Sequence, residues 1–416
     1  MFDSLNIAIV WEQKEWGGID SYLCYMINNW PNQHDSFVIY YNKENKGALR
    51  LKKILNNKVE VSFKEIRSSF RFKECVNFMD VLLKLTAYII TPLLFIHSII
   101  KYKNIFKHEN FDVVMAQNGG YPGSYGVISS LFAASSTGIP VRTLVVHHAA
   151  TKPDFLQNSF RLIMEKKLSV ILSSVISVSK VTEETLLKNT RIFDDQNCYV
   201  TVIDNGIPSD SEHNNNNESN AHLLTPTINV NDKLKIGILG RLEPYKGHDD
   251  FLCALSLLSD KCRNKISVDI IGSYNKCDYD RLMSIIKILD LKDFVNIKGY
   301  VDLPVRDIVN QLDLLAMVTK TFEGFGLTII EALYQNVPVL ATKVGVVPEI
   351  FSNDSSLLVN VGDYNDIARA IELFVNSPNK EIFISEEVKQ KLARYDAKYM
   401  ASRYHQYFMF ERIKIS

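Results

Sequence analysis

The sequence predicts an α/β protein made of two doubly wound parallel sheets. Apolar runs of five to eight residues alternate with longer amphipathic stretches, a pattern typical of parallel strands joined by helical crossovers. The polar, asparagine-rich segment 209–232 interrupts this alternation, and the series of runs then starts again. Such a segment cannot bury much apolar surface, and 416 residues are enough for two or three domains. We therefore expect two α/β domains joined by a linker.

The first domain is predicted to span residues 1–205, the linker 206–232 and the second domain 233–394. The runs predicted as strands of the first domain are 6–11, 36–41, 59–63, 111–116, 141–148, 174–179 and 198–204. Those predicted for the second domain are 234–240, 266–272, 294–300, 312–318, 338–343 and 355–360. Ligands bind such sheets beyond the carboxyl ends of the strands, so we expect a site in a cleft where the two domains face each other.

Composition and charge exclude several classes of protein. Hydrophobic residues make up 46% of the chain and charged residues 23%, which excludes a wholly disordered, collagen-like or coiled-coil chain. The 47 Lys and Arg residues balance 47 Asp and Glu residues, so the chain as a whole is not expected to bind nucleic acid. The six cysteines include no C-x-x-C pair, which favours a reducing compartment over a disulfide scaffold or structural zinc. The start, MFDSLNIAIV, is predicted to form a buried strand rather than a signal peptide.

The segment 81–100 is almost entirely apolar and, as a helix, would be about 30 Å long. A membrane span is disfavoured because strands of one sheet are predicted on both sides of the segment, and because Pro92 interrupts it. Residues 43–110 contain 14 Lys and Arg against 6 Asp and Glu, a balance of +8. An apolar face framed by positive charge suits peripheral docking on an anionic membrane surface, which we prefer. Burial in the core of the first domain is the alternative.

The richest motif is EGFGLTIIEAL at 323–333, which follows a predicted strand and opens a predicted helix. Its glycines allow close approach of a ligand, and the helix start offers free N–H groups, an arrangement that binds diphosphates. Glu323 and Glu331 flank it, and a helical connection would separate them by about 12 Å. This spacing suits one acid near a sugar and the other near a ribose. The alternative is an ordinary glycine-rich turn with Glu331 in solvent.

Two further loops carry a similar pattern. The run GILGRLEPYKGHDDFLCAL at 237–255 places Arg241 and Lys246 between a strand and a helix, where two cations can balance a departing diphosphate without a metal. An ordinary solvated loop is the alternative. Near the N-terminus, Gly17 and Gly18 lie between a predicted strand and a helix, which makes this a weaker candidate for a phosphate-approaching loop.

Other motifs point to different chemistry and are less convincing. Asp278 and Asp280 form a D-x-D, which could hold Mn²⁺ or Mg²⁺, but carboxylates at a predicted helix start more often act as caps. His147 and His148 are adjacent on a strand, where side chains point to opposite faces and cannot chelate one metal. We expect His147 to face the cleft and His148 to pack beneath it. The absence of G-x-S-x-G, P-loop and G-x-G-x-x-G motifs disfavours a hydrolase triad, an NTPase or a dehydrogenase.

Taken together, R-L-x-x-x-K-G, E-G-F-G-L-T-I-I-E-A-L and PVLATKVGVVPEI resemble the retaining glycosyltransferases of the large family 4, which have the GT-B fold. The resemblance extends over much of the chain. It includes the glycine pair near the N-terminus, VVHH at 145–148, ISVSKVTEETL at 176–186 and VIDNGIP at 202–208. The segment 395–416 is similar to the final helix of that family, which crosses back to the first domain.

The resemblance implies a nucleotide-sugar-dependent transferase, a hexosyltransferase that retains anomeric configuration and needs no metal or other cofactor. Arg241 and Lys246 would hold the diphosphate of a UDP- or GDP-sugar. Glu331 would bind the ribose, Glu323 the transferred sugar, and Gly18 would let the first domain close on the phosphates. His147 would lie near the reaction centre. Backbone N–H groups would come from the segment Phe325, Gly326 and Leu327.

The acceptor is expected to be lipid-linked or a growing surface glycan, such as a capsule or lipopolysaccharide, at the cytoplasmic face of a membrane. Two positions depart from the family pattern. Gln335 and Asn336 stand where the family usually has glycine, but Asn tolerates a left-handed turn. Gly345 and Val346 replace a glycine pair, which could reshape the wall of the donor site. The second departure supports an alternative function, a catalytically silent nucleotide-sugar-binding or scaffold partner.

Overall fold

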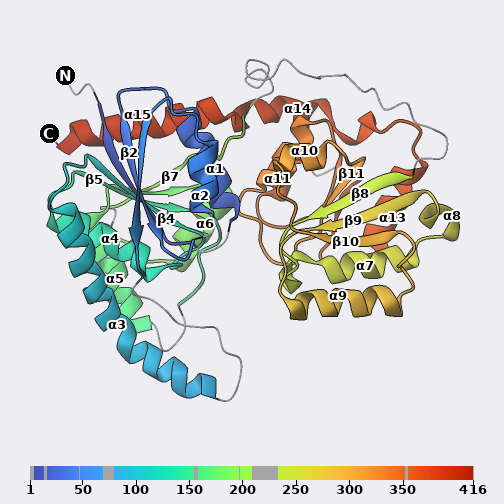
Figure 1. Ribbon diagram of the computed structural model, residues 1–416, viewed down its shortest axis with the longest axis horizontal. Coiled ribbons are helices and arrows are strands. Elements are labelled where there is room, and N and C mark those ends of the chain that lie inside the picture. The colour runs from blue at the N-terminus through green and yellow to red at the C-terminus, as the bar shows by residue number, and fades with distance from the viewer. Residues whose placement is uncertain are drawn as a thin grey trace. The chain divides into compact units, whose positions relative to one another are not determined.

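The computed structural model describes residues 4–13, 16–45, 47–68, 79–153, 158–195, 197–208, 233–351 and 355–415. The chain divides into two compact units. The first contains Met1–Gly206 together with Asp396–Ser416, and the second contains Ile207–Tyr395 (Figure 1). The predicted linker falls largely on 209–232, which lies outside the described residues.

The first unit is built on a parallel sheet of seven strands in the order β3-β2-β1-β4-β5-β6-β7. Its strands are β1 (Asn6–Trp11), β2 (Ser36–Asn42), β3 (Glu60–Ile66), β4 (Val113–Asn118), β5 (Val141–Val146), β6 (Ser174–Ser177) and β7 (Val200–Val202). The central strands β1 and β4 are buried almost along their whole length because both of their faces are covered, as expected of a parallel sheet.

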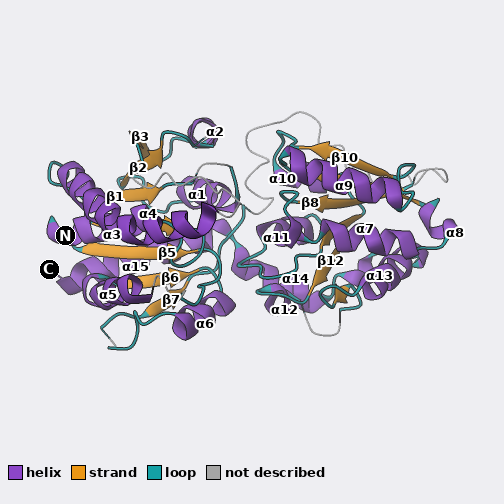
Figure 2. Cartoon of the chain, turned by 90° about the horizontal axis from the view of Figure 1, so that it is seen from below, coloured by secondary structure: helices purple, strands orange, loops and turns teal. Residues whose placement is uncertain are grey.

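The helices of the first unit cover the two faces of this sheet (Figure 2). They are α1 (Gly18–Asn28), α2 (Ala48–Ile54), α3 (Met79–Phe106), α4 (Tyr125–Ser136), α5 (Asn158–Ile171), α6 (Lys180–Asn189) and α15 (Ala397–Ile415). Helix α15 packs against α1 and β5. It is tied to the rest of the unit by an ion pair between Arg412 and Asp112 (2.8 Å) and by contact of His405 with Asp35 (3.3 Å).

The second unit has a parallel sheet of six strands in the order β10-β9-β8-β11-β12-β13. Its strands are β8 (Leu234–Leu239), β9 (Ile266–Ile271), β10 (Val295–Gly299), β11 (Leu314–Met317), β12 (Val339–Thr342) and β13 (Leu358–Val359). Its helices, 3-10 turns included, are η2 (Pro244–Lys246), α7 (His248–Leu257), α8 (Asp260–Arg263), α9 (Lys276–Ile288), α10 (Val305–Val309), α11 (Leu327–Tyr334), α12 (Val347–Ile350), α13 (Tyr364–Asn376), η3 (Glu381–Phe383), α14 (Glu386–Leu392) and η4 (Ala393–Tyr395).

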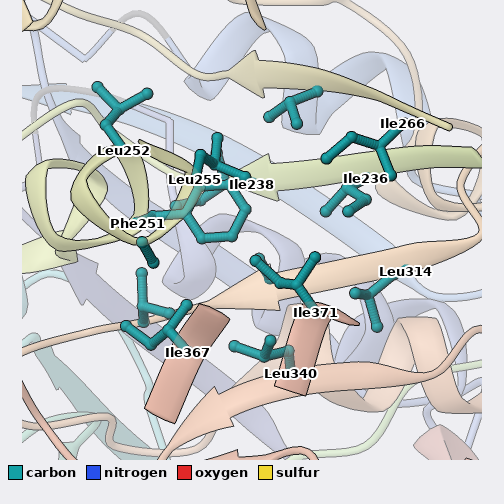
Figure 3. Close-up of a cluster of buried hydrophobic side chains, with 14 of the residues drawn as sticks. Ile236, Ile238, Phe251, Leu252, Leu255, Ile266, Leu314, Leu340, Ile367 and Ile371 are labelled. Atoms are coloured by element: carbon teal, nitrogen blue, oxygen red, sulfur yellow. The ribbon is translucent and has the colours of Figure 1, made fainter. Parts of the chain in front are cut away.

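A core of aliphatic and aromatic side chains holds one layer of helices against the second sheet. Phe251 and Leu255 of α7 and Ile367 and Ile371 of α13 meet the buried face of β8, β9, β11 and β12 (Figure 3). Burying each large apolar side chain stabilises the fold by about 1.5–3 kcal/mol. This packing fixes the positions of the strands and therefore of the loops that leave their carboxyl ends.

Each sheet has one point at which the strand order reverses. In the first sheet it lies between β1 and β4, and in the second between β8 and β11. Loops that leave two neighbouring strands at such a point diverge to opposite sides and leave a crevice for a ligand. In the second unit these are the loops 240–247 and 318–326, which carry Arg241, Lys246 and Glu323.

The predicted fold class is confirmed, and each of the predicted runs contains a strand. One expectation is wrong: Pro92 does not interrupt the apolar segment but lies inside helix α3. The turns that follow the proline pack on α4, where Ser98 shares a hydrogen bond of 2.7 Å with Ser129. Among the described residues, the structure contains no helix with the length and hydropathy needed to cross a membrane.

Candidate functional site

The loop after β8 carries both predicted cations. Gly240 has a φ of +149°, and Arg241 follows it as an exposed residue. The short turn η2 ends at Gly247, whose φ is +79°. A Cβ atom at Gly247 would lie 1.9 Å from the carbonyl oxygen of Val318, so only glycine fits. This close contact places Lys246 beside the end of β11.

Lys246 and Glu323 meet although 77 residues separate them. Lys246 Nζ lies 3.3 Å from Glu323 Oε2, and 23% and 15% of the two side chains are exposed. Lys320 makes two further contacts that connect the loops. Its backbone N–H donates to the carbonyl of Tyr245 at 2.7 Å, and the Nζ of Lys320 lies 2.8 Å from Asp250 Oδ1. The structure thus brings one predicted cation and one predicted carboxylate together at the strand-order reversal of the second sheet.

Arg241 is held differently. Its Nη1 lies 2.9 Å from Glu243 Oε1, its Nη2 lies 3.3 Å from the hydroxyl of Tyr245, and 52% of its side chain is exposed. It therefore shares a loop with Lys246 but not the same degree of burial.

The glycine-rich motif forms the loop before α11 and the first turn of that helix. Gly326, with a φ of +75°, is its N-cap, so no cap side chain covers the N–H groups of the first turn. The ring of Phe325 is buried against Tyr395, with ring centres 5.3 Å apart. Glu331 lies one turn into the helix and is buried, which excludes the solvated alternative.

The expected spacing of about 12 Å between Glu323 and Glu331 assumed a helical connection. This assumption is wrong, because the chain is a loop as far as Gly326 and becomes helical only at Leu327. The loop turns back so that Glu323 contacts Lys246 rather than lying on the helix axis.

The two departures from the family pattern have clear structural outcomes. Asn336 adopts a left-handed conformation with φ +55°, as expected. Gly345 has a φ of +53°, and a Cβ atom there would lie 2.0 Å from the carbonyl oxygen of Glu323. Val346 is buried in a right-handed conformation, and its N–H donates to that same oxygen at 2.9 Å. The segment with the substituted glycine therefore still supports Glu323.

In the first unit, the glycine loop is shaped by an acid that the sequence did not single out. Gly17 has an extended backbone and is the N-cap of α1, which begins at Gly18. The N–H of Gly17 donates to Asp20 Oδ2 at 2.6 Å, and Gln13 Nε2 lies 3.4 Å from the same oxygen. Asp20 is fully buried, and burial raises its pKa to about 7. An acid three residues after the N-cap is a capping signature that could have identified it.

His147 follows β5 and packs against the same helix. Its Nε2 lies 2.8 Å from Gln117 Oε1, and its ring contacts that of Tyr22 edge to face, with centres 4.7 Å apart. Desolvation by burial lowers the pKa of His147 to about 3, so the imidazole is neutral at physiological pH. Tyr22 lies one turn beyond Gly18 in α1. The predicted residues Gly18 and His147 therefore lie on neighbouring elements of the first unit.

The D-x-D motif opens helix α9. Asn275 is the N-cap, and its side chain accepts a hydrogen bond from the N–H of Asp278 at 2.8 Å. Asp278 lies in the first turn and also pairs with Arg281 at 3.6 Å. The motif is therefore part of a helix start, as preferred, although the cap is Asn275 rather than a carboxylate.

Comparison with known proteins finds similar chains among the glycosyltransferases. Residues 226–391 match the family described as "Glycosyl transferases group 1". The phosphatidylinositol N-acetylglucosaminyltransferase GPI3 subunit of Saccharomyces cerevisiae strain YJM789 is 24% identical over 279 residues, which cover 66% of this chain and 57% of that protein. The capsular polysaccharide biosynthesis glycosyltransferase CapM of Staphylococcus aureus is 25% identical over 287 residues, 67% of this chain and 71% of CapM.

The chain spans about half the length of the first curated relatives that it matches, 57% and 49%. Among solved structures, Anabaena Alr3699/HepE in complex with UDP superposes with a TM-score of 0.69 at 16% identity, covering 97% of this chain and 100% of that one. A glycosyltransferase from Rickettsia africae ESF-5 superposes with a TM-score of 0.71 at 19% identity, covering 99% and 100%.

Two parallel Rossmann-like sheets, each with one reversal of strand order, are the architecture of the GT-B fold, and the solved structures share this fold. Within the chain, residues 226–391 are similar to the group 1 glycosyltransferases, and CapM is a similar protein over 67% of the chain.

Proposed function

We propose that the protein is a retaining glycosyltransferase that moves a sugar from a nucleoside diphosphate to an acceptor without a metal ion. The observation that carries the proposal is the meeting of Lys246 with Glu323 beside the start of α11, at the strand-order reversal of the second sheet. Cations and unshared helix N–H groups stabilise a diphosphate leaving group, and a carboxylate accepts hydrogen bonds from sugar hydroxyls.

In this proposal the second unit binds the donor. Arg241 and Lys246 take up the charge that develops on the departing diphosphate, and the N–H groups of the segment Phe325, Gly326 and Leu327 add to it. Glu331 binds the ribose and Glu323 the sugar. HepE has been crystallised with UDP and with UDP-glucose, which makes a UDP-sugar the first donor to test.

The first unit would bind the acceptor. Gly18 would allow close approach to the phosphates, and His147 would lie near the reacting carbon of the sugar. Because His147 is neutral, it would act as a hydrogen-bonding group rather than as a charged one. The mechanism we favour is attack on the face that the leaving group vacates, assisted by the departing phosphate, because no matched carboxylate is an obvious covalent nucleophile.

A thermal-shift panel tests donor binding. We expect UDP or GDP, with the matching nucleotide sugar, to raise the melting temperature, since a ligand at 100 times its Kd stabilises the folded state by about 2.7 kcal/mol. Slow hydrolysis of the same nucleotide sugar should persist in EDTA. The double variant Lys246→Ala/Glu331→Ala should lose both effects. Full activity of that variant, or indifference of the wild type to all nucleotides, would contradict the proposal.

Acceptor and location belong to the same proposal. CapM is named for capsular polysaccharide biosynthesis and the GPI3 subunit for a phosphatidylinositol substrate, which favours a lipid-linked or surface-glycan acceptor at the cytoplasmic face of a membrane. Helix α3 supports peripheral docking. Phe95, Ser98 and Tyr102 of this helix are buried. Large apolar residues at other positions of the helix remain exposed: Ile90, Leu93, Ile96 and Ile100. Lys103 and Lys107 follow them, also exposed.

Vesicle co-sedimentation tests this docking. Leu93→Asp/Ile96→Asp should reduce binding to vesicles that contain phosphatidylglycerol by about tenfold or more, since burial of one such side chain contributes about 1.5–3 kcal/mol. Ile288→Asp, which changes a 79% exposed isoleucine on α9, should bind like the wild type. Equal binding of all three proteins would argue that α3 does not touch the membrane.

A further inference from the structure

The paired charges at the donor site have a consequence for product release. Lys246 is held by Glu323, so any phosphate that binds Lys246 must share it with a carboxylate or displace that carboxylate. Both groups are more than three-quarters buried, which weakens solvent screening of the charges. A phosphate placed on Lys246 therefore lies close to a second negative charge.

Sugar-linked and free diphosphates present different groups to Glu323. A nucleotide sugar presents hydroxyl groups, and these donate hydrogen bonds to the carboxylate in place of the lysine. A free nucleoside diphosphate presents a terminal phosphate, which carries additional negative charge and no such donors. Glu323 thus attracts the first molecule and repels the second.

We propose that Glu323 is a specificity-determining residue that discriminates against the spent nucleoside diphosphate by competing with it for Lys246. The inference rests on the proposed function, since it takes the donor to be a nucleotide sugar. It adds a role for the carboxylate after transfer. When the sugar leaves, Glu323 loses its hydroxyl partners, returns to Lys246 and weakens the hold on the product.

The neighbouring pair supplies a matched control. Glu243 makes the same kind of ion pair with Arg241 at 2.9 Å, in the same loop as Lys246. Its side chain is 33% exposed and that of Arg241 is 52% exposed, against 15% for Glu323. Exposed pairs are screened and interact weakly. Removing the charge of Glu243 should therefore leave the discrimination between product and donor nearly unchanged.

Isothermal titration calorimetry of the full chain with UDP and with UDP-glucose provides the test. GDP and a GDP-sugar replace them if those ligands bind instead. Glu323→Gln should bind UDP at least about threefold more tightly and UDP-glucose at least about threefold more weakly. The preference for the sugar form should thus fall about tenfold. Glu243→Gln should change that preference by less than about twofold. UDP should also become a stronger product inhibitor of Glu323→Gln.

Several results would overturn the inference. If Glu323→Gln binds UDP and UDP-glucose more weakly by the same factor, Glu323 only shapes the site. If the variant binds both more tightly by the same factor, the effect is a general one of charge, without discrimination. Failure of the wild type to bind either nucleotide would overturn the proposed function itself, which separates the two failures. Melting temperatures of both variants within a few degrees of the wild type establish that the folded protein is being compared.

Discussion

Each of the two units has a helix that begins directly after a glycine loop. The two helix starts differ in the acidic residues of the first turn and in the conformation of the N-cap glycine. Helix α1 has Asp20 in its first turn, and this carboxylate accepts the N–H of the N-cap Gly17. Helix α11 has no acidic residue in its first turn, and its N-cap Gly326 is left-handed. The start of α1 is thus occupied by an acid of the chain's own, whereas no acid lies in the first turn of α11, whose N–H groups are available to an anion. Similar glycine patterns in the sequence therefore lead to different electrostatics.

The difference extends to the loops behind the two helices. Asp20 Oδ1 faces Gly47 at the start of α2, where a Cβ atom would lie 2.9 Å away. The glycine loop of the first unit is therefore fixed by a buried side chain. In the second unit Gly345 lies against the backbone of Glu323, so the loop before α11 is fixed by a backbone contact. The buried acid of the first loop titrates, whereas the contact at Gly345 is between backbone atoms and does not.

The largest effect is expected at Gly345. Gly345→Ala would place a Cβ atom 2.0 Å from the Glu323 carbonyl oxygen and would impose a left-handed conformation on alanine. Glu323 would have to move, and a displacement of about 1 Å near reacting groups can lower activity about 100-fold. Steady-state transfer kinetics measure the loss. Unchanged kcat/KM would show that the backbone contact does not position Glu323.

A smaller and paired effect is expected at the two N-cap glycines. Gly326→Ala forces a left-handed alanine, which costs about 1–2 kcal/mol and lowers the melting temperature by roughly 2–8 °C. Gly17→Ala keeps an extended φ of −167°, and its Cβ atom meets only the flexible end of Gln13. It should melt like the wild type. Equal destabilisation of the two variants would remove the contrast between the two helix starts.

The smallest effect concerns pH. The pKa of Asp20 is raised from 3.8 to about 7 by burial, with Arg50 as the neighbouring charge that opposes the rise. The folded state therefore binds this proton more strongly than the unfolded state, and stability falls as pH rises from about 4 to about 7. Asp20→Asn cannot ionise. Its melting temperature relative to the wild type should be higher at pH 8 than at pH 5, whereas parallel curves would contradict a buried, titrating carboxyl.

Much of the fold could be predicted because buried parallel strands leave a direct trace in the sequence. Every apolar run that was predicted as a strand contains one, as expected of sheets whose faces are covered by helices. The predicted ends of the strands were less accurate. Strand β13, for example, contains only two of the six residues predicted for it. The helix continues through Pro92, against the prediction, because the one missing N–H is offset by packing of the following turns on α4.

The candidate site was predictable as a set of residues but not as a geometry. Glycine spacing identified the loop before α11, and charge identified Arg241 and Lys246. That Lys246 meets Glu323 depends on the adjacency of β8 and β11, which chain order does not give. Asp20 was missed because a capping pattern says nothing of burial. Its contact with the next loop arises only from tertiary packing.

Helix α15 has a practical consequence for dividing this protein into fragments. Because the segment Asp396–Ser416 completes the first unit, the second unit is an insertion within it rather than a separable C-terminal half. A fragment ending at Gly206 would leave Tyr22 without the ring of Tyr404, and it would expose an aromatic surface to solvent. Excision of 207–395, with Gly206 rejoined to Asp396 by a short loop, is the division that respects the architecture.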